Sequence, residues 1–318
     1  MGPVVSPLVR AGTTGKSLAI ILLLAPADTF SAKQGAKRVL ATTHWTLEDI
    51  DWSAFDPGAV DEELLAVVKT AALVEANSED YVTYLHNVFP DDEAFKRAAD
   101  YWGEEEAQHG LALGRWAELA DKQFSFDASL KYFRSVYSLP LEVAQSVRGS
   151  RGGELLARCV VESGTCSFYS AIRDFTDEPV LRQICHRIAQ DESKHYRLFF
   201  EHGRNYPQPA MWERLRIALG RVLETEDDEF GYAYYSANHL AESDLKPYDR
   251  AECAGTYQRM ATSMYRAEHV RTVVHMIALA LGVRPQHPLV RAIGRVGWWS
   301  LRRRNRSYKS RVASAGAA

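Results

Sequence analysis

Glu106-Ala107-Gln108-His109 and Glu192-Ser193-Lys194-His195 are two copies of the pattern Glu-x-x-His in a chain of 318 residues. Residues three apart on an α-helix lie on the same face, so the Glu and the His of each copy can point into one cavity. Each copy therefore offers one carboxylate and one imidazole to a shared site. The fold is predicted outward from these two pairs.

A single glutamate precedes each copy on an apolar stretch. Glu75 lies 31 residues before Glu106, and Glu162 lies 30 residues before Glu192. The similar offsets predict two helical hairpins related by a pseudo-twofold axis. An unpaired carboxylate is costly in apolar surroundings, and a bound cation removes that cost. Exposed helix salt bridges are the competing interpretation, and the apolar neighbours of Glu75 and Glu162 count against it.

The set of residues matches a known type of metal site. Four-helix proteins that bind two iron or manganese ions take one Glu from each of two helices and one Glu-x-x-His from each of the other two. Carboxylate and imidazole ligands suit these metals, and the absence of thiolates argues against structural zinc. We expect Glu75 and His109 on one metal, Glu162 and His195 on the other, and Glu106 and Glu192 as bridges.

An acidic residue precedes the glutamate of each copy, Glu105 in the first and Asp191 in the second. Such a carboxylate can accept the ring N–H of a metal-binding imidazole and so hold the ring in place. We therefore expect both to support the histidine ligands.

Helix-forming segments dominate the rest of the chain, and no convincing strand is present. The expected helices cover residues 61–85, 92–121, 127–147 with an interruption at Pro140, 154–176, 178–205, 210–226, 247–282 and 287–303. The predicted fold class is all-α, with a four-helix bundle core and additional helices packed outside it. We expect one domain over residues 41–303, an N-terminal extension over 1–40 and a basic tail over 304–318.

Charge is distributed unevenly along the chain. The net charge is −3, yet nine Lys and Arg and no Asp or Glu follow Val283, so the remainder sums to −12 (29 minus 41). Such a basic end suits an acidic partner, whether a carrier protein, membrane headgroups or nucleic acid. We expect no nucleic acid, and a merely solvated end is the alternative. The hydrophobic content of 46% is ample for a substantial core.

Further motifs point to a family. Residues 181–195 end in Asp-Glu-Ser-Lys-His, and residues 104–110 read Glu-Glu-Glu-Ala-Gln-His-Gly. Residues 162–165 read Glu-Ser-Gly-Thr, and Tyr81 follows Glu75 by six positions. In this combination the chain resembles the soluble acyl-acyl carrier protein desaturases of the ferritin-like superfamily. The spacings between the ligand motifs are shorter than in the plant-type pattern, which leaves the substrate open.

The resemblance covers residues 45–205 and carries several expectations. It implies a ferritin-like bundle, a homodimer, two iron ions as the cofactor, and O2 and a ferredoxin-type electron donor as partners. The implied reaction introduces a cis double bond into a fatty acyl chain on acyl carrier protein or another acyl carrier. Trp45 and Asp49 resemble the family's Trp-x-x-x-Asp electron-transfer element.

Thr165 is the candidate catalytic residue. The resemblance places its hydroxyl beside the oxygen-binding face of the metals, where it is suited to hydrogen bonding or proton transfer. A hydroxyl bonded back to the carbonyl four residues earlier is an equally good interpretation of a helical threonine.

The main alternative function is another di-iron oxygenase of the same superfamily, a hydroxylase or an N-oxygenase. Ile188 stands where arylamine N-oxygenases carry an additional histidine, which counts against that group. Ferritin subunits are much shorter than this chain, which disfavours iron storage, and a metal-free binding protein is the remaining alternative. An acyl substrate needs an apolar tunnel, for which the expected lining is Tyr101, Trp102, Phe168, Tyr169, Phe199 and Phe200. Plain core packing is the other interpretation of these aromatic residues.

The two ends of the chain bear on location. The apolar run from Leu18 to Ala25 follows Arg10 and Lys16 and has the outline of a signal peptide. An iron enzyme with cytosolic electron donors belongs inside the cell, so we favour a cytoplasmic protein. Four cysteines without Cys-x-x-Cys spacing agree with a reducing compartment. At the other end, the basic segment with its two tryptophans suits an acidic carrier protein or a membrane interface.

Overall fold

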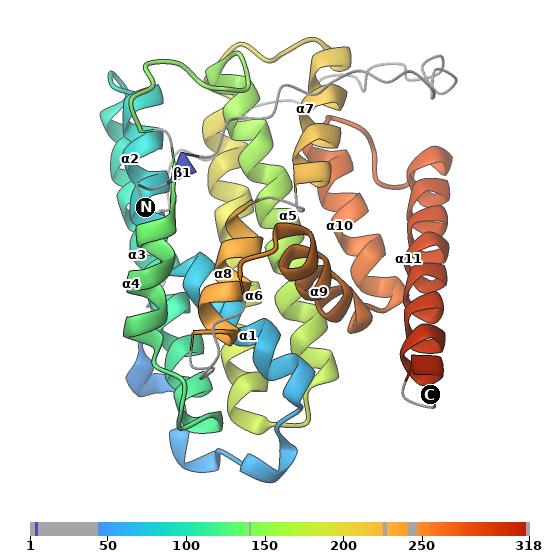
Figure 1. The fold of residues 1–318 in the computed structure, drawn as a ribbon. Coiled ribbons are helices and arrows are strands. Elements are labelled where there is room, and N and C mark those ends of the chain that lie inside the picture. The colour runs from blue at the N-terminus through green and yellow to red at the C-terminus, as the bar shows by residue number, and fades with distance from the viewer. Residues whose placement is uncertain (1–3, 6–43, 140, 225–227, 241–246, 316–318) are drawn as a thin grey trace.

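The computed structural model describes residues 4–5, 44–139, 141–224, 228–240 and 247–315, with side chains from 44 to 305 within these ranges (Figure 1). The described chain is mostly helical, as the all-α prediction requires. The expected extension over residues 1–40 lies outside the described residues, apart from Val4 and Val5. Among the residues described, no helix combines the length and apolar character needed to cross a bilayer.

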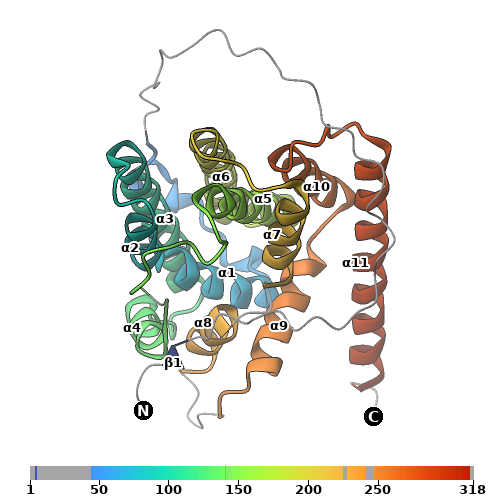
Figure 2. The ribbon, with the colours of Figure 1, turned by 90° about the horizontal axis from the view of Figure 1, so that it is seen from above.

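Four helices carry the expected ligands: α1 (Glu62–Glu75), α3 (Glu93–Ala120), α5 (Arg151–Phe175) and α6 (Pro179–Gly203). They lie together in the middle of the molecule, where α5 packs along α6, α1 packs along α3, and α3 also contacts α6 (Figures 1 and 2). Each begins at a residue whose side chain accepts a backbone N–H of the first turn. These caps are Asp61, Asp92, Ser150 and Glu178.

The ligand-bearing helices place a polar layer between two apolar ones. On α3, residues 95–102 belong to one buried apolar cluster and residues 112–117 to another, with Glu106 and His109 between them. The same order holds on α5 and, in reverse, on α6. Because the helices pack side by side, the polar residues of all three meet at one level, sealed from water above and below.

The segment expected as one helix over residues 61–85 is two helices, α1 and α2 (Ser78–Val88). The break follows Glu75, where the N–H of Ala76 is shared between the carbonyls of Ala72 and Val74. The backbone of α3 lies against this corner at Gly110, and Arg134 donates to the carbonyl of Ala76 at 2.7 Å. Glu75 is thus held at the end of a helix rather than in its middle.

We expect Gly110→Ala to destabilise the metal-free protein by about 3 kcal/mol, because overpacked cores must shift to make room. A Cβ at Gly110 would lie 2.6 Å from the backbone N of Ala76 and 2.8 Å from the carbonyl O of Ala72. Urea denaturation followed by circular dichroism measures the effect. The matched control is Gly164→Ala, where a Cβ meets nothing within 4 Å and helix propensity predicts a gain of about 1 kcal/mol. Equal stabilities for the two variants would contradict this close contact.

The remaining elements surround the four ligand helices. They are the 3-10 helices Leu47–Asp49, Trp52–Ala54 and Pro57–Ala59, the helices α4 (Phe126–Val136), α7 (Met211–Leu223), α8 (Asp228–Asn238), α9 (Arg250–Ser263), α10 (Ala267–Ala280) and α11 (Pro288–Ala315), and the strands β1 (Val4–Val5) and β2 (Tyr137–Ser138). The two strands form a parallel pair of two residues each.

Three of these elements differ from the sequence-based expectation. No strand was expected, yet β2 occupies part of the segment expected as the helix 127–147. No helix was expected where α8 lies, and the expected helix 247–282 is divided into α9 and α10. Helix α11 runs past residue 303, so the expected boundary of the basic tail falls inside a helix.

Candidate metal centre

The six expected ligands converge in the polar layer, and all are buried, with exposed fractions between 0% and 9%. They form two groups in which one ligand atom per residue lies within 4.8 Å of the others. The first group is Glu75, Glu106, His109 and Glu192, and the second is Glu106, Glu162, Glu192 and His195. Glu106 and Glu192 belong to both groups. The geometry is that of two adjacent cation positions sharing two carboxylates.

Both histidines point Nδ1 into this cluster. Nδ1 of His109 lies 3.3 Å from Oε2 of Glu106 and 3.5 Å from Oε1 of Glu192. Nδ1 of His195 lies 3.1 Å from Oε1 of Glu106 and 3.6 Å from Oε2 of Glu162. The carboxylate of Glu106 therefore lies between the two imidazoles.

Several polar atoms of the cluster lack hydrogen-bond partners. They are Nδ1 of His109, Nδ1 of His195, Oε1 of Glu162 and Oε1 of Glu192, all buried. A buried polar atom without a partner costs about 1–3 kcal/mol. Electron-pair donors that face one another without hydrogen bonds are the arrangement that a metal ion satisfies, so the residues present fit a metal.

The charge of the cluster also fits two divalent cations. Burial, with repulsion from Glu106, raises the pKa of Glu75 to about 8. Burial likewise raises the pKa of Glu162 well above its usual value, in spite of the nearby His195. Four ionised carboxylates in this apolar surrounding carry a charge of −4, which two divalent cations balance. Metal binding would therefore remove the electrostatic strain that the protein alone relieves by protonation.

The acidic residues beside the ligands support the histidines in a crossed arrangement. Asp191, next to Glu192 on α6, lies 3.2 Å from Nε2 of His109 on α3. Glu105 on α3 lies 3.0 Å from Nε2 of His195 on α6. When Nε2 donates its proton to the carboxylate, Nδ1 presents its lone pair to the cluster. Each Glu-x-x-His motif thus depends on the acidic residue of the other.

Trp45 takes part in this support. Its indole N–H donates to Oδ2 of Asp191 at 2.6 Å, and its ring stacks on the ring of His109 with centroids 6.0 Å apart. Asp49 instead accepts the backbone N–H of Thr46. Trp45 and Asp49 are therefore not hydrogen-bonded to each other.

We expect Asp191→Asn to weaken metal binding about tenfold to a hundredfold at the position held by Glu75 and His109, since residues that orient a metal-binding histidine typically contribute this much. Competition with a chelator measures the affinity, and anomalous diffraction from crystals identifies the weakened position. The control is Asp177→Asn, the same change at a residue whose side chain is 94% exposed. Loss confined to the position of Glu162 and His195 would contradict the crossed arrangement.

A cavity of about 340 Å³ adjoins the cluster along α5. Glu75 and Thr165 form part of its wall, and most of the rest is apolar: Ala71, Val74, Val160, Val161, Phe168, Phe230, Ala261, Val273 and Ile277. One part of the lining is charged and comes from Arg221, Glu224 and Glu229. Sequence reasoning missed this charged group, because α8 was not expected and nothing in the local pattern relates α7 to α5.

The hydroxyl of Thr165 has partners that agree with both interpretations of this residue. It donates to Oε2 of Glu192 and also lies 3.3 Å from the carbonyl O of Val161, four residues earlier. Thr165 therefore connects the cavity wall with a shared carboxylate of the cluster.

Only part of the expected aromatic lining borders this cavity. Phe168 and Tyr169 are in its wall, and the hydroxyl of Tyr169 donates to Glu75. Trp102 and Phe199 pack against each other in the apolar cluster on the other side of the polar layer. Tyr101 and Phe200 are 40% and 36% exposed. Helical spacing placed these four residues near the ligands in sequence, but their side chains leave α3 and α6 in other directions.

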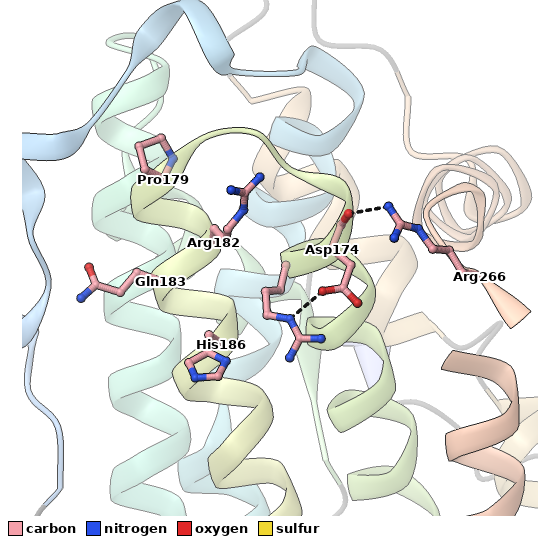
Figure 3. A pocket seen from close by; sticks show the side chains of 7 residues that line it. Asp174, Pro179, Arg182, Gln183, His186 and Arg266 are labelled. Carbon is pink, nitrogen blue, oxygen red and sulfur yellow. Dashed lines mark hydrogen bonds and ion pairs between the residues drawn. The ribbon is translucent and has the colours of Figure 1, made fainter. Parts of the chain in front are cut away.

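A second depression lies at the turn between α5 and α6, away from the six ligands (Figure 3). Three of its charged residues, Arg173, Asp174 and Arg266, are hydrogen-bonded to one another. Nε of Arg173 donates to Oδ1 of Asp174, and Arg266 donates to the carbonyl O of Asp174, both at 2.7 Å. The bond from Arg173, followed by that from His269, lowers the pKa of Asp174 to about 2. These contacts tie α5 to the start of α10.

The fold and the site together define a mostly helical protein with a buried carboxylate and histidine cluster that suits metal ions. No family model and no curated protein sequence matches the chain. The family therefore remains a resemblance carried by the ligand motifs themselves.

Proposed function

We propose that the protein is an O2-dependent di-iron oxidoreductase on a ferritin-like four-helix bundle, and that it desaturates a fatty acyl chain bound to acyl carrier protein or a similar carrier. The observation that carries this proposal is the pair of ligand groups that share Glu106 and Glu192 beside an apolar cavity. Neither a single metal nor an exposed salt bridge requires two shared, buried carboxylates. The motif resemblance then favours iron and desaturation.

A bound pair of ferrous ions would supply the electrons that activate O2 for removal of hydrogen from an unactivated C–H bond. The residues of the chain provide the surroundings for this step. The apolar clusters above and below exclude water, and Asp191 and Glu105 orient the two imidazoles. Thr165 holds a proton on its hydroxyl where the cavity wall meets Glu192.

The size of the cavity suits part of an acyl chain. A cavity of about 150 Å³ accommodates benzene with its six carbons, so 340 Å³ corresponds to about fourteen carbons. The walls beside Glu75 and Thr165 are largely hydrocarbon and can hold an extended chain next to the metals. We infer that the chain enters with its carrier outside the protein.

The partners follow from the same proposal. We infer a ferredoxin-type electron donor, supported by the contact from Trp45 through Asp191 to His109. A homodimer rests on the family resemblance alone. A cytoplasmic location is supported by the four buried cysteines, Cys159, Cys166, Cys185 and Cys253, none of which forms a disulfide.

A second candidate is an oxygenase of the same di-iron type that acts on a small molecule. The charged part of the cavity lining favours it. Glu229 accepts the hydroxyl of Tyr81 at 2.8 Å, and Arg221 donates to Glu224 at 2.9 Å. A substrate with a polar end and an apolar body would match this division of the lining.

Intact mass spectrometry distinguishes the two candidates. The iron-loaded protein is incubated with medium-chain and long-chain acyl-acyl carrier proteins, O2 and a reducing system of ferredoxin and its reductase. Loss of two hydrogens from the acyl chain is the expected result. Gain of one oxygen would replace desaturation by oxygenation. No change in any acyl chain, with two irons confirmed by elemental analysis, would overturn the substrate class while leaving the metal centre.

A further inference from the structure

Helix α11 forms one side of the molecule and packs on α10 and α9, while its outer side faces away from the other described helices (Figures 1 and 2). Its inner side is anchored by Val290, which is 5% exposed, and by Gly297, which lies close to Val270 of α10. Toward its end, Asn305 donates to the carbonyl O of Thr262 on α9 at 2.9 Å. The helix is therefore a fixed part of the fold.

The outer side of α11 carries an apolar ridge. Ile293, Val296 and Trp299 are 49%, 63% and 60% exposed. They recur every three residues, so they follow one another along about 9 Å of the helix axis within an arc of about 120°. Eight of the fourteen exposed large hydrophobic side chains among the described residues lie on α7, α10 and α11. Apolar exposure is thus concentrated on this side of the molecule.

Arginines border the ridge. Three arginines, Arg291, Arg295 and Arg302, are exposed. Their spacing in the helix places them along one edge of the apolar ridge. Arg303 lies over the ring of Trp299, with its guanidinium carbon 5.5 Å from the ring centroid. No Asp or Glu follows Val283 in the sequence, so no carboxylate of α11 itself offsets these charges.

We propose that the outer face of α11 binds the surface of an anionic lipid bilayer, with the helix lying parallel to the membrane. Ile293, Val296 and Trp299 enter the boundary between headgroups and acyl chains, and the arginines at the edge meet lipid phosphates. A basic helix with exposed Trp and aliphatic residues is the usual form of an interfacial membrane helix. The long arginine stems can lie along the apolar region while the guanidinium groups reach the headgroups.

The shape of the face favours a bilayer over a protein partner. Protein interfaces usually place large apolar side chains in well-packed pockets of the partner. Here the apolar side chains form a ridge on a convex helix, which a fluid lipid surface can enclose without a matching groove. Each arginine near an anionic surface adds to the attraction, and the face offers several at once.

Helix α11 lies near the cavity beside the metal cluster. Thr262, which Asn305 contacts, also lines the cavity beside the metal cluster. A bilayer on α11 would therefore lie close to the wall of the cavity formed by α9. This proposal does not depend on the reaction at the metals and is tested without it.

Vesicle co-sedimentation of the full-length protein tests the proposal. We expect binding to vesicles of mixed phosphatidylglycerol and phosphatidylcholine, weakening with added salt, and little binding to pure phosphatidylcholine. Arg295→Gln with Arg302→Gln should weaken binding about thirtyfold, because each arginine near the surface contributes about fivefold. Trp299→Ala should weaken it further through the lost apolar contact. Arg295, Trp299 and Arg302 are exposed, so these variants should keep the fold, which circular dichroism checks.

The matched control is Arg97→Gln with Lys122→Gln, which makes the same change of charge at exposed positions on or beside α3, across the molecule from α11 (Figure 2). Absence of binding to the anionic vesicles would overturn the proposal. Equal weakening by the control pair would also overturn it, since binding would then depend on net charge alone. Self-association of the wild type that only the α11 variants lose would assign the face to a second copy of the chain. Without vesicle binding, an acidic acyl carrier protein that binds the wild type but not the α11 variants would assign it to that protein.

Discussion

Glu106→Ala is expected to remove both metal ions, leaving less than a tenth of the iron that the wild type binds. Glu106 is the carboxylate that lies between the two histidines and belongs to both ligand groups. Its loss takes one ligand from each position and one unit of the negative charge that holds two cations together. Elemental analysis after anaerobic loading with ferrous ion gives the number of irons per chain.

The control for this variant is Glu104→Ala, two residues earlier on the same helix at an exposed position. It should bind two irons. The metal-free Glu106→Ala protein should unfold at a lower free energy than the metal-free wild type, because the carboxylate that lies between the buried imidazoles of His109 and His195 is gone. Full retention of iron by Glu106→Ala would contradict the proposal that Glu106 is shared by two metal positions. A metal-free binding protein predicts instead that Glu106→Ala leaves stability and activity unchanged.

Gly164→Leu is expected to lower turnover about a hundredfold while both irons remain bound. Gly164 lies in the cavity wall next to Thr165, and a Cβ placed there meets no heavy atom within 4 Å. A leucine side chain can therefore extend into the cavity without displacing the helices. Exclusion of substrate from its reactive position, even by about 1 Å, is enough to cost two orders of magnitude.

Two measurements separate this effect from damage to the protein. Thermal unfolding should occur at the same or a higher temperature, because leucine is a better helix former than glycine. Isothermal titration calorimetry with a medium-chain fatty acid should show binding to the wild type and to Gly164→Ala but not to Gly164→Leu. Wild-type turnover in Gly164→Leu would mean that the substrate binds elsewhere.

The sequence was sufficient to predict three of the four helices that carry the expected ligands, α3, α5 and α6, because their signals are local. Caps, turn residues and the 3.6-residue period act within a few residues, and α3, α5 and α6 begin and end within a few residues of the expected positions. The six residues of the buried cluster could be selected for the same reason. A lone glutamate on an apolar helix and a Glu-x-x-His motif can both be recognised in the sequence itself, whatever the helix packs against.

Contacts between helices could not be predicted in this way. The break after Glu75 is set by the approach of α3 at Gly110, which lies 35 residues away in the sequence (110 minus 75). The cavity wall combines α1 and α5 with α7 to α10, so its charged residues, Arg221 and Glu229, have no neighbours in sequence that indicate a site. Such features depend on which faces of distant helices meet.

The crossed support of the histidines separates what the sequence determines from what only the tertiary structure determines. The sequence by itself determined that each Glu-x-x-His motif has an adjacent carboxylate, since residues 105 and 191 are acidic. It did not determine which imidazole each carboxylate holds. Neighbouring residues on a helix point about 100° apart, so Asp191 cannot face the same way as Glu192, and only the packing of α3 against α6 brings it to His109. The sequence determines which acidic residues and histidines each helix carries. The packing of the helices determines which acidic residue supports which histidine.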